Sequence, residues 1–290
     1  MADFEARAIA PARELGAYEA LWAREGTSFK SLAEMFRSAP GAMPSDLVRA
    51  GEARRYGHLA LAAIKAARIT RFGIRVHGAG EYPAPLRDAQ YPVELLHFQG
   101  NWDLASSPAI AIIGTRQPTA DGIRRAKALA QACVGAGFTV VSGLARGIDT
   151  TAHRAAIEAG GRTIAVLGTP ITACYPKENL VLQWQIAQDF LLISQVPIVK
   201  HARQGWQRNR QFFRERNVTM SALTSATVIV EAGNTSGALI QARHALLQRR
   251  KVFLLDSCVR NPELSWPAPM LERGAISVAD FDEIRVHLAV

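Results

Sequence analysis

Short apolar runs alternate with longer helical patterns along the chain from about residue 109 onward. Several of these runs are rich in β-branched residues and end at a glycine accompanied by serine or threonine, after which a helical pattern begins. Strands are expected at 109–113, 138–142, 163–168, 190–194, 227–231 and 252–255, and helices at 121–135, 149–159, 178–189, 208–222 and 237–248. This alternation predicts an α/β fold with a doubly wound parallel sheet.

The pattern before residue 75 is helical throughout. Apolar side chains recur at helical spacing, and Ser31 with Glu34 has the spacing of a capping box. We therefore expect a small helical domain of three or four helices over residues 1–75, and a sheet core over 76–290. At the boundary, Ile74 and Val76 alternate with polar residues and predict an edge strand, which a proline-rich extended arm follows. Whether the helical domain binds a partner or only packs stays open.

The net charge favours an acidic partner, and the aromatic residues among the cations favour a single-stranded nucleic acid. The 290 residues carry a formal net charge of +9, and a hydrophobic content of 49% is enough for a packed core. A basic run over 200–220 holds one acid and interleaves cations with aromatic rings, an arrangement that suits single-stranded nucleic acid. Trp206, beside Gly205, is the better candidate for base stacking. Phe212 and Phe213 are expected either to stack or to lie in the core.

Other features restrict the class of protein. The chain has three scattered cysteines without metal-ligand spacing, no apolar stretch of about 20 residues, and no basic-then-apolar signal sequence. We expect a cytoplasmic protein with no metal, no cofactor and no membrane partner. An apolar segment over 264–271 is expected either to pack on its own sheet or to form an interface.

The ends of the predicted strands indicate an anion site. Gly114, Thr115 and Arg116 follow the first core strand and precede a helix, so loop amides, the helix dipole and a guanidinium favour phosphate there. Similar loops follow other strands, and in an open α/β sheet all such loops lie at one edge. The sequence therefore predicts a site for a polyanion or a nucleotide.

These motifs resemble those of the DNA-processing protein DprA (Smf) family. The resemblance runs from about residue 82 to about 284. It rests on Gly114-Thr115-Arg116 with Thr119, the block Ser142-Gly143-Leu144-Ala145-Arg146-Gly147-Ile148-Asp149 with His153, Tyr175-Pro176-Lys177-Glu178-Asn179, Arg216-Asn217, and Val230-Glu231-Ala232 followed by Ser236-Gly237-Ala238-Leu239-Ile240. The block at 142–149 is long and specific.

The resemblance implies a Rossmann-like domain that binds single-stranded DNA, often as a homodimer, without an established catalytic activity. Members of the family deliver the DNA to a RecA-type recombinase during natural transformation, so roles in DNA uptake, recombination or defence are implied. The residues expected to contact DNA or phosphate are Gly114, Thr115, Arg116, Ser142, Gly143, Arg146, Lys177, Arg214, Arg216, Asn217, Ser236 and Gly237, with Trp206 and Phe212 as stacking candidates.

The chain departs from the family pattern at several positions. Asp121 stands where tyrosine is usual and either repels a phosphate or caps the following helix, and Val218 replaces a cation. The chain is also expected to be a divergent member that lacks the usual C-terminal winged helix. A nucleotide-binding sensor or a nucleotide-processing enzyme of the same superfamily is the alternative.

Few residues suggest catalysis. Asp149 and His153 lie one helical turn apart, so a local hydrogen bond with a structural role is expected. Glu231 ends a strand, and its carboxylate is a candidate for a general base or for binding a ribose hydroxyl. Without a Walker loop or a metal-binding carboxylate pair, no catalytic residue is assigned.

Overall fold

The computed structural model describes residues 9–87, 89 and 91–288, and it divides into two compact units. The first unit contains the chain up to Gly100 together with Leu167–Cys174 and Ile193–Glu215. The second contains Asn101–Val166, Tyr175–Leu192 and Arg216 onward. Both units are therefore built from several chain segments, and the domain boundary expected at residue 75 stays a prediction.

Helices form the first part of the first unit, as the apolar spacing predicts. They are α1 (Pro11–Ala23), α2 (Phe29–Arg37), the short 3-10 helix η1 (Pro44–Asp46) and α3 (Ala50–Ala66). Helices α1 and α3 approach closely at Gly16, where an added Cβ would lie 2.0 Å from the Ala53 carbonyl oxygen. The N-cap of α2 is Ser28 in a capping box with Ser31, so the pairing expected between Ser31 and Glu34 is wrong.

Two buried carboxylates of α1 bind backbone amides of other segments in this unit. Glu14 accepts from the Ser45 amide at 2.9 Å, at the start of η1. Glu19 accepts from the amides of Ile198 and Val199 at 2.6 and 2.9 Å, at the start of α8 (Ile198–Arg203). These amides are among those that a helix leaves unpaired at its N-terminus, so α1 fixes both short helices.

An antiparallel pair of strands follows these helices in the first unit. Strand β1 (Gly73–Val76) pairs with β2 (Leu95–Gly100), and the segment between them includes the short helix α4 (Ala84–Arg87). This agrees with the strand and arm expected there.

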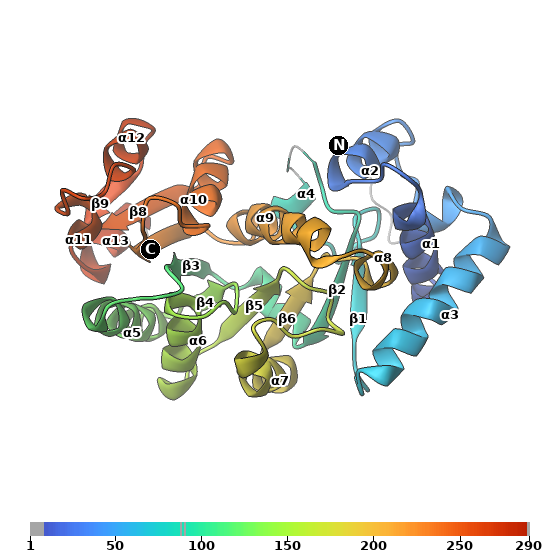
Figure 1. Ribbon diagram of the computed structural model, residues 1–290, viewed down its shortest axis with the longest axis horizontal. Helices are drawn as coiled ribbons and strands as arrows, with labels where there is room; N and C mark the ends of the chain where they lie inside the picture. Colours follow the sequence, from blue (N-terminus) through green and yellow to red (C-terminus); the bar gives the residue numbers. More distant parts are fainter. Residues whose placement is uncertain (1–8, 88, 90, 289–290) are drawn as a thin grey trace. The chain divides into compact units, whose positions relative to one another are not determined.

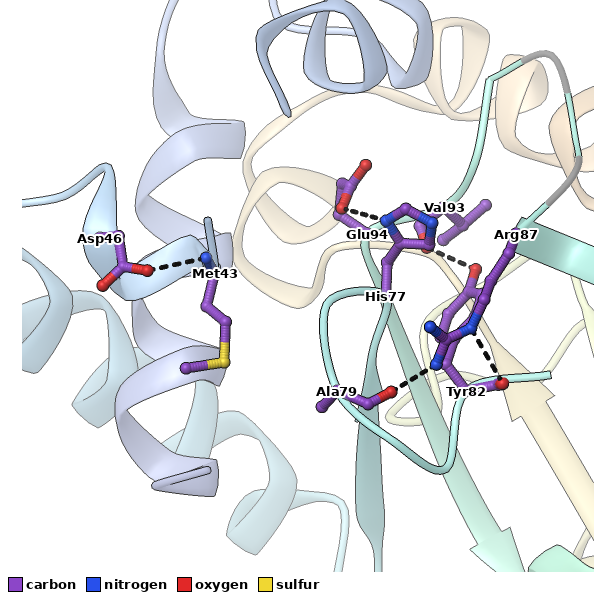
Figure 2. Close-up of polar contacts among 8 residues, drawn as sticks. All are labelled: Met43, Asp46, His77, Ala79, Tyr82, Arg87, Val93 and Glu94. Carbon is purple, nitrogen blue, oxygen red and sulfur yellow. Dashed lines mark hydrogen bonds and ion pairs between the residues drawn. The ribbon is translucent and has the colours of Figure 1, made fainter. Parts of the chain in front are cut away.

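Polar contacts tie the connecting segment together (Figure 2). His77 faces the Glu94 carboxylate at 3.3 Å, and the Tyr82 hydroxyl and the Arg87 guanidinium donate to the carbonyl oxygens of Val93 and Ala79. Burial raises the pKa of Glu94, and the hydrogen bond from His77 opposes that shift.

The second unit is built around a mostly parallel sheet with helices on it (Figure 1). The strand order includes β6-β5-β4-β3-β7-β8-β9, and the pairs β3–β4, β3–β7, β4–β5, β7–β8 and β8–β9 are parallel. The strands are β3 (Ala109–Gly114), β4 (Thr139–Ser142), β5 (Thr163–Leu167), β6 (Leu191–Ser194), β7 (Ala226–Glu231), β8 (Lys251–Leu255) and β9 (Ile276–Val278). The doubly wound sheet expected from the sequence is confirmed.

Helices alternate with these strands. They are α5 (Ala120–Gly135), α6 (Ile148–Glu158), η3 (Lys177–Asn179) with α7 (Leu180–Asp189), α9 (Trp206–Ala222), which begins in the first unit, α10 (Ala238–Leu247), α11 (Asp256–Val259), α12 (Pro267–Glu272) and α13 (Phe281–Leu288); η2 (Trp102–Ser106) precedes β3. Helix α8 was not expected, because a six-residue helix after Pro197 has too few positions to show a period.

The core of the second unit lies between the sheet and the helices α5, α6 and α13. Buried residues of β3, β7 and β8 meet small apolar residues of α5 and α6 there. The apolar segment near the C-terminus packs within the same unit. Trp266 and Met270 are buried, and the Trp266 indole donates to the Ala232 carbonyl oxygen at 3.0 Å. Of the two alternatives for this segment, packing on its own unit is the one observed for these two side chains.

Candidate nucleic-acid interface

The loop after β3 is closed by a carboxylate from β7. The Thr115 amide donates to the Glu231 carbonyl oxygen at 2.7 Å, and the Glu231 carboxylate accepts from the Thr119 amide at 3.0 Å and from its hydroxyl at 2.7 Å. Thr119, not Asp121, is the N-cap of α5, and it accepts from the Gly122 amide. An internal anion therefore occupies the α5 N-terminus, where the sequence predicted phosphate.

A second internal carboxylate closes the loop after β4. Asp149 accepts from the amides of Gly143 and Ala145 at 3.1 and 3.3 Å. Burial raises the pKa of Asp149, and the charge of Arg216 is the largest opposing effect. Ser142 is also buried and donates to the Ile112 carbonyl oxygen at 2.7 Å. In this conformation the amides of Gly143 and Ala145 and the Ser142 hydroxyl are engaged within the protein.

His153 does not pair with Asp149, so the hydrogen bond expected between them is wrong. Its Nδ1 lies 2.6 Å from the Thr163 hydroxyl, in a fully buried position. Burial, with the nearby Arg216 charge, lowers the pKa of His153 to about 3. His153 is therefore neutral near pH 7 and holds α6 against β5.

Arg216 is buried under the same loop. One of its terminal nitrogens donates to the carbonyl oxygens of Gly143 and Val166 at 2.7 and 2.6 Å, and its Nε donates to Asn217 at 3.0 Å. Burial lowers the pKa of Arg216, Asp149 opposes that shift, and Arg116 lies near enough to add to it. Two of the three Arg216 guanidinium nitrogens thus donate to oxygens of the protein in this buried position, and the phosphate contact expected of Arg216 stays a prediction.

Three of the exposed cations of the second unit lie on the strand-end loops and on η3. Arg116, Arg146 and Lys177 are exposed, and Arg146 forms an ion pair with Glu178. Asn179 donates to the Leu144 carbonyl oxygen at 2.9 Å, which ties η3 to the loop that carries Arg146.

The other residues expected to contact phosphate differ in accessibility. Asn217 is largely buried, and its amide lies 3.5 Å from the Gly237 carbonyl oxygen. The Ser236 hydroxyl accepts from the Ala238 amide at 3.3 Å, while Gly237 is exposed. Gly114 and Thr115 are half-buried and Gly143 is buried.

Helix α9 presents a different surface in the first unit. Trp206 is 51% exposed and lies edge-on to Phe213, with ring centroids 5.9 Å apart. Arg210 and Arg214 are exposed, and the spacing 206, 210, 213 and 214 places these side chains on one face of the helix. This face combines an accessible ring with two cations, which are the elements of a surface that binds single strands.

Phe212 faces the opposite way and is fully buried. Its ring packs edge-on against Trp22 and Phe29, with centroids 5.9 and 6.1 Å away. The stacking role expected for Phe212 is therefore wrong in this conformation. The helical period is the sequence signal that separates the two rings. Phe213 lies seven residues, or about two turns, after Trp206 and so shares its face, whereas Phe212 does not.

Part of the basic run stabilises the first unit. The Lys200 ammonium donates to the Thr27 carbonyl oxygen at 2.9 Å and lies 5.0 Å from the Trp22 ring centroid. Arg203 lies 5.6 Å from the Tyr56 ring centroid. Fewer cations are thus available to a ligand than the sequence suggests.

Two further findings concern the described residues alone. Among residues 9–87, 89 and 91–288, no group of three or more histidine, cysteine, aspartate or glutamate side chains is arranged to hold a metal ion. Over the same residues, no helix is both long enough and apolar enough to cross a bilayer.

The second unit defines a class: doubly wound α/β proteins whose strand-end loops are closed by their own carboxylates and flanked by exposed cations. The chain belongs to the DNA recombination-mediator protein A family, whose model matches residues 73–289. This confirms the resemblance seen in the sequence.

Relatives agree with this membership. The chain is 36% identical over 212 residues to protein Smf of Synechocystis sp., covering 72% of this chain and 52% of that protein. It is 34% identical over 205 residues to the DNA processing protein DprA of Bacillus subtilis, covering 70% and 67% respectively. The chain thus spans about half the length of the Synechocystis relative.

Two solved structures are similar to most of this chain. The X-ray structure of DNA processing protein A from Streptococcus pneumoniae matches with a TM-score of 0.72 and 25% identity, covering 94% of this chain and 97% of that one. DNA processing protein A from Helicobacter pylori, studied for its single-stranded DNA binding mode, matches with a TM-score of 0.63 and 26% identity, covering 76% and 96%.

Proposed function

We propose that this protein binds single-stranded DNA without catalysing a reaction on it. The observation that carries the proposal is that backbone amides of the strand-end loops bind carboxylates of the protein, whereas cations of these loops and of η3 are exposed. The Thr119, Gly143 and Ala145 amides bind Glu231 and Asp149, whereas Arg116, Arg146 and Lys177 are exposed. Amides cradle a small phosphate group, whereas exposed cations on several loops suit the repeated phosphates of a strand.

Two further observations support this proposal. The exposed face of α9 adds Trp206 and the cations Arg210 and Arg214 to the first unit. The Helicobacter pylori relative is described by its binding to single-stranded DNA. Nucleotide sensing or processing, the alternative from the sequence, has no comparable support, because the carboxylates occupy the amides that it would use.

The test is a titration of the protein into labelled single-stranded oligonucleotide, with free nucleotides as competitors. If Arg116, Arg146, Lys177 and Arg214 each contact a phosphate, log affinity falls against log salt with a slope of about −3, from roughly −0.7 per contact. Arg116→Ala weakens binding to all sequences alike, because phosphate contacts carry no base information. Arg154→Ala, which removes an exposed cation from α6, is the matched control. Efficient competition by mononucleotides would refute the proposal.

Absence of catalysis is tested by chromatography of nucleoside monophosphates and triphosphates after incubation with the protein. We expect the nucleotides unchanged. Release of free base that Glu231→Gln abolishes would make this protein a nucleotide hydrolase instead.

The proposal extends to assembly and pathway. We propose a cytoplasmic homodimer that delivers single-stranded DNA to a RecA-type recombinase, in DNA uptake, recombination or defence. Leu247, 79% exposed at the end of α10, is one apolar side chain available to an interface. Light scattering at micromolar concentration tests the dimer, and a recombinase filament assay with and without this protein tests delivery. A mass of one chain across the range contradicts a stable dimer.

A further inference from the structure

We propose that Arg216 is a positioning residue for DNA binding, which acts through the 143–147 loop and sets the direction of Arg146. Its effect on DNA rests on the proposed function, whereas its effect on the loop does not. The residues that carry the inference all lie in the second unit.

The guanidinium of Arg216 binds the start of this loop from its buried side, next to β5. It donates to the Gly143 carbonyl oxygen at 2.7 Å and to the Val166 carbonyl oxygen of β5 at 2.6 Å, so it joins the loop to the sheet. The approach at Gly143 is close, because an added Cβ would lie 2.0 Å from the guanidinium nitrogen and Arg216 would have to move. Arg216 and the backbone at Gly143 are thus packed as one unit.

Asp149 holds the same loop from the helix side. Its carboxylate binds the amides of Gly143 and Ala145, and its charge is the largest effect that opposes the lowering of the Arg216 pKa by burial. Removing one of two opposite buried charges leaves the other without its compensating charge, which is strongly destabilising. The loop therefore depends on the pair rather than on either residue alone.

Further bonds extend this support up to Arg146. The Leu144 residue, in the left-handed region at φ 58°, has its carbonyl oxygen bound by Asn179. The Ala145 carbonyl oxygen accepts from the Thr150 hydroxyl at 2.6 Å, and the Gly147 carbonyl oxygen accepts from Thr151 at 3.0 Å. Backbone bonds thus flank Arg146 on both sides, while its exposed side chain forms an ion pair with Glu178. A cation on a fixed backbone loses less entropy when it binds a phosphate.

The experiment is a double-mutant cycle on the full chain, with Arg216→Lys, Arg146→Ala and the double variant. Lysine keeps the positive charge, but its single nitrogen cannot bond Asn217 as the Arg216 Nε does while also reaching the Gly143 and Val166 carbonyl oxygens. The readouts are single-stranded oligonucleotide affinity by fluorescence anisotropy, the active fraction by stoichiometric titration, and amide hydrogen exchange of 142–150. Arg154→Ala is the control for loss of an exposed cation in the same unit.

We expect each single variant to weaken affinity about tenfold, and the double variant to be no weaker than Arg146→Ala alone, because both act on one contact. Exchange in 142–150 rises in Arg216→Lys with the active fraction unchanged. Three results overturn the proposal: additive losses, which indicate a separate contact by Arg216; wild-type affinity in Arg216→Lys; or a loss confined to the active fraction, which indicates a structural role only.

Failure of the proposed function gives a different result. If the wild-type protein does not bind the oligonucleotide, the proposed DNA binding by this chain is refuted. Amide exchange in 142–150 still tests whether Arg216 holds the loop. Unchanged exchange in both Arg216→Lys and Arg216→Met refutes that part as well.

Discussion

Arg214 and Arg216 lie two residues apart on α9 and have opposite environments. Arg214 is exposed, whereas Arg216 is buried and donates to the carbonyl oxygens of Gly143 and Val166. Trp206 and Phe212 show the same contrast on this helix, since Trp206 is half exposed and Phe212 is fully buried. A run of cations and aromatic rings therefore mixes exposed and buried residues, and the period of the helix separates them.

The largest expected effect is on stability at Arg216. Arg216→Met leaves the Asp149 charge unpaired in a buried site, which we expect to lower the free energy of unfolding by about 3–5 kcal/mol. Arg214→Ala removes an exposed cation and should change it by less than about 0.5 kcal/mol. Urea denaturation followed by circular dichroism measures both. Equal effects at the two positions would break the comparison.

Substitutions of Phe212 and Trp206 should have different effects, the first on the free energy of unfolding and the second on oligonucleotide affinity. Phe212→Ala leaves a cavity beside Trp22 and Phe29, which costs about 3–5 kcal/mol of unfolding free energy. Trp206→Ala leaves stability nearly unchanged and weakens oligonucleotide binding by about 1–3 kcal/mol. Trp206→Phe keeps a stacking ring and serves as the control. Full affinity in Trp206→Ala would remove α9 from the interface.

A pH-dependent effect is expected at Glu19 in the first unit. Burial raises the pKa of Glu19 to about 7, against the hydrogen bonds from Ile198 and Val199 that lower it. Because the pKa in the folded state lies above the unfolded value, the folded protein binds the proton more tightly. The contribution of Glu19 to stability is thus complete below about pH 4.5 and is lost as the pH rises through 7.

Glu19→Gln should flatten this decline, by on the order of 2 kcal/mol between pH 5 and pH 8. The measurement is urea denaturation at both pH values, with Glu25→Gln at an exposed position as the control. Burial raises the pKa of Glu94 and lowers those of His97 and His153, so these groups titrate as well, and the difference between variant and wild type is the quantity to compare. A parallel pH profile would contradict the assignment.

A smaller effect is expected at the N-terminus of α5. Glu231→Ala removes the carboxylate that binds Thr119, and we expect a loss of about 1 kcal/mol of unfolding free energy, as for other helix caps. Thr119→Ala should cost a similar amount, and the double variant should cost less than the sum because the two residues share one hydrogen-bond network. Additive losses would show that Glu231 does not act as part of the cap.

Much of the fold could be predicted because apolar runs and helical periods are local signals. The runs at 109–113 and 227–231 became β3 and β7, and the helical pattern before residue 75 became α1, α2 and α3. Short elements such as α8 carry too few positions for a period to appear.

The site was predicted less completely, because burial of polar residues depends on distant partners. Arg116, Arg146 and Lys177 were expected to be accessible and are exposed, yet their contact with phosphate stays a prediction. The bonds of Glu231 to Thr119 and of Arg216 to Gly143 join residues far apart in the sequence. Spacing along the chain carries no information about such pairs, so Arg216 was expected to contact phosphate and the bond between Glu231 and Thr119 was not expected.

The salt dependence of oligonucleotide binding by Arg146→Ala, Arg214→Ala and the wild type tests the central claim most directly. We predict that each variant reduces the slope of log affinity against log salt by about 0.7, since each loses one exposed phosphate contact. Arg154→Ala should keep the wild-type slope. A wild-type slope near zero, or slopes unchanged in both variants, would contradict the account.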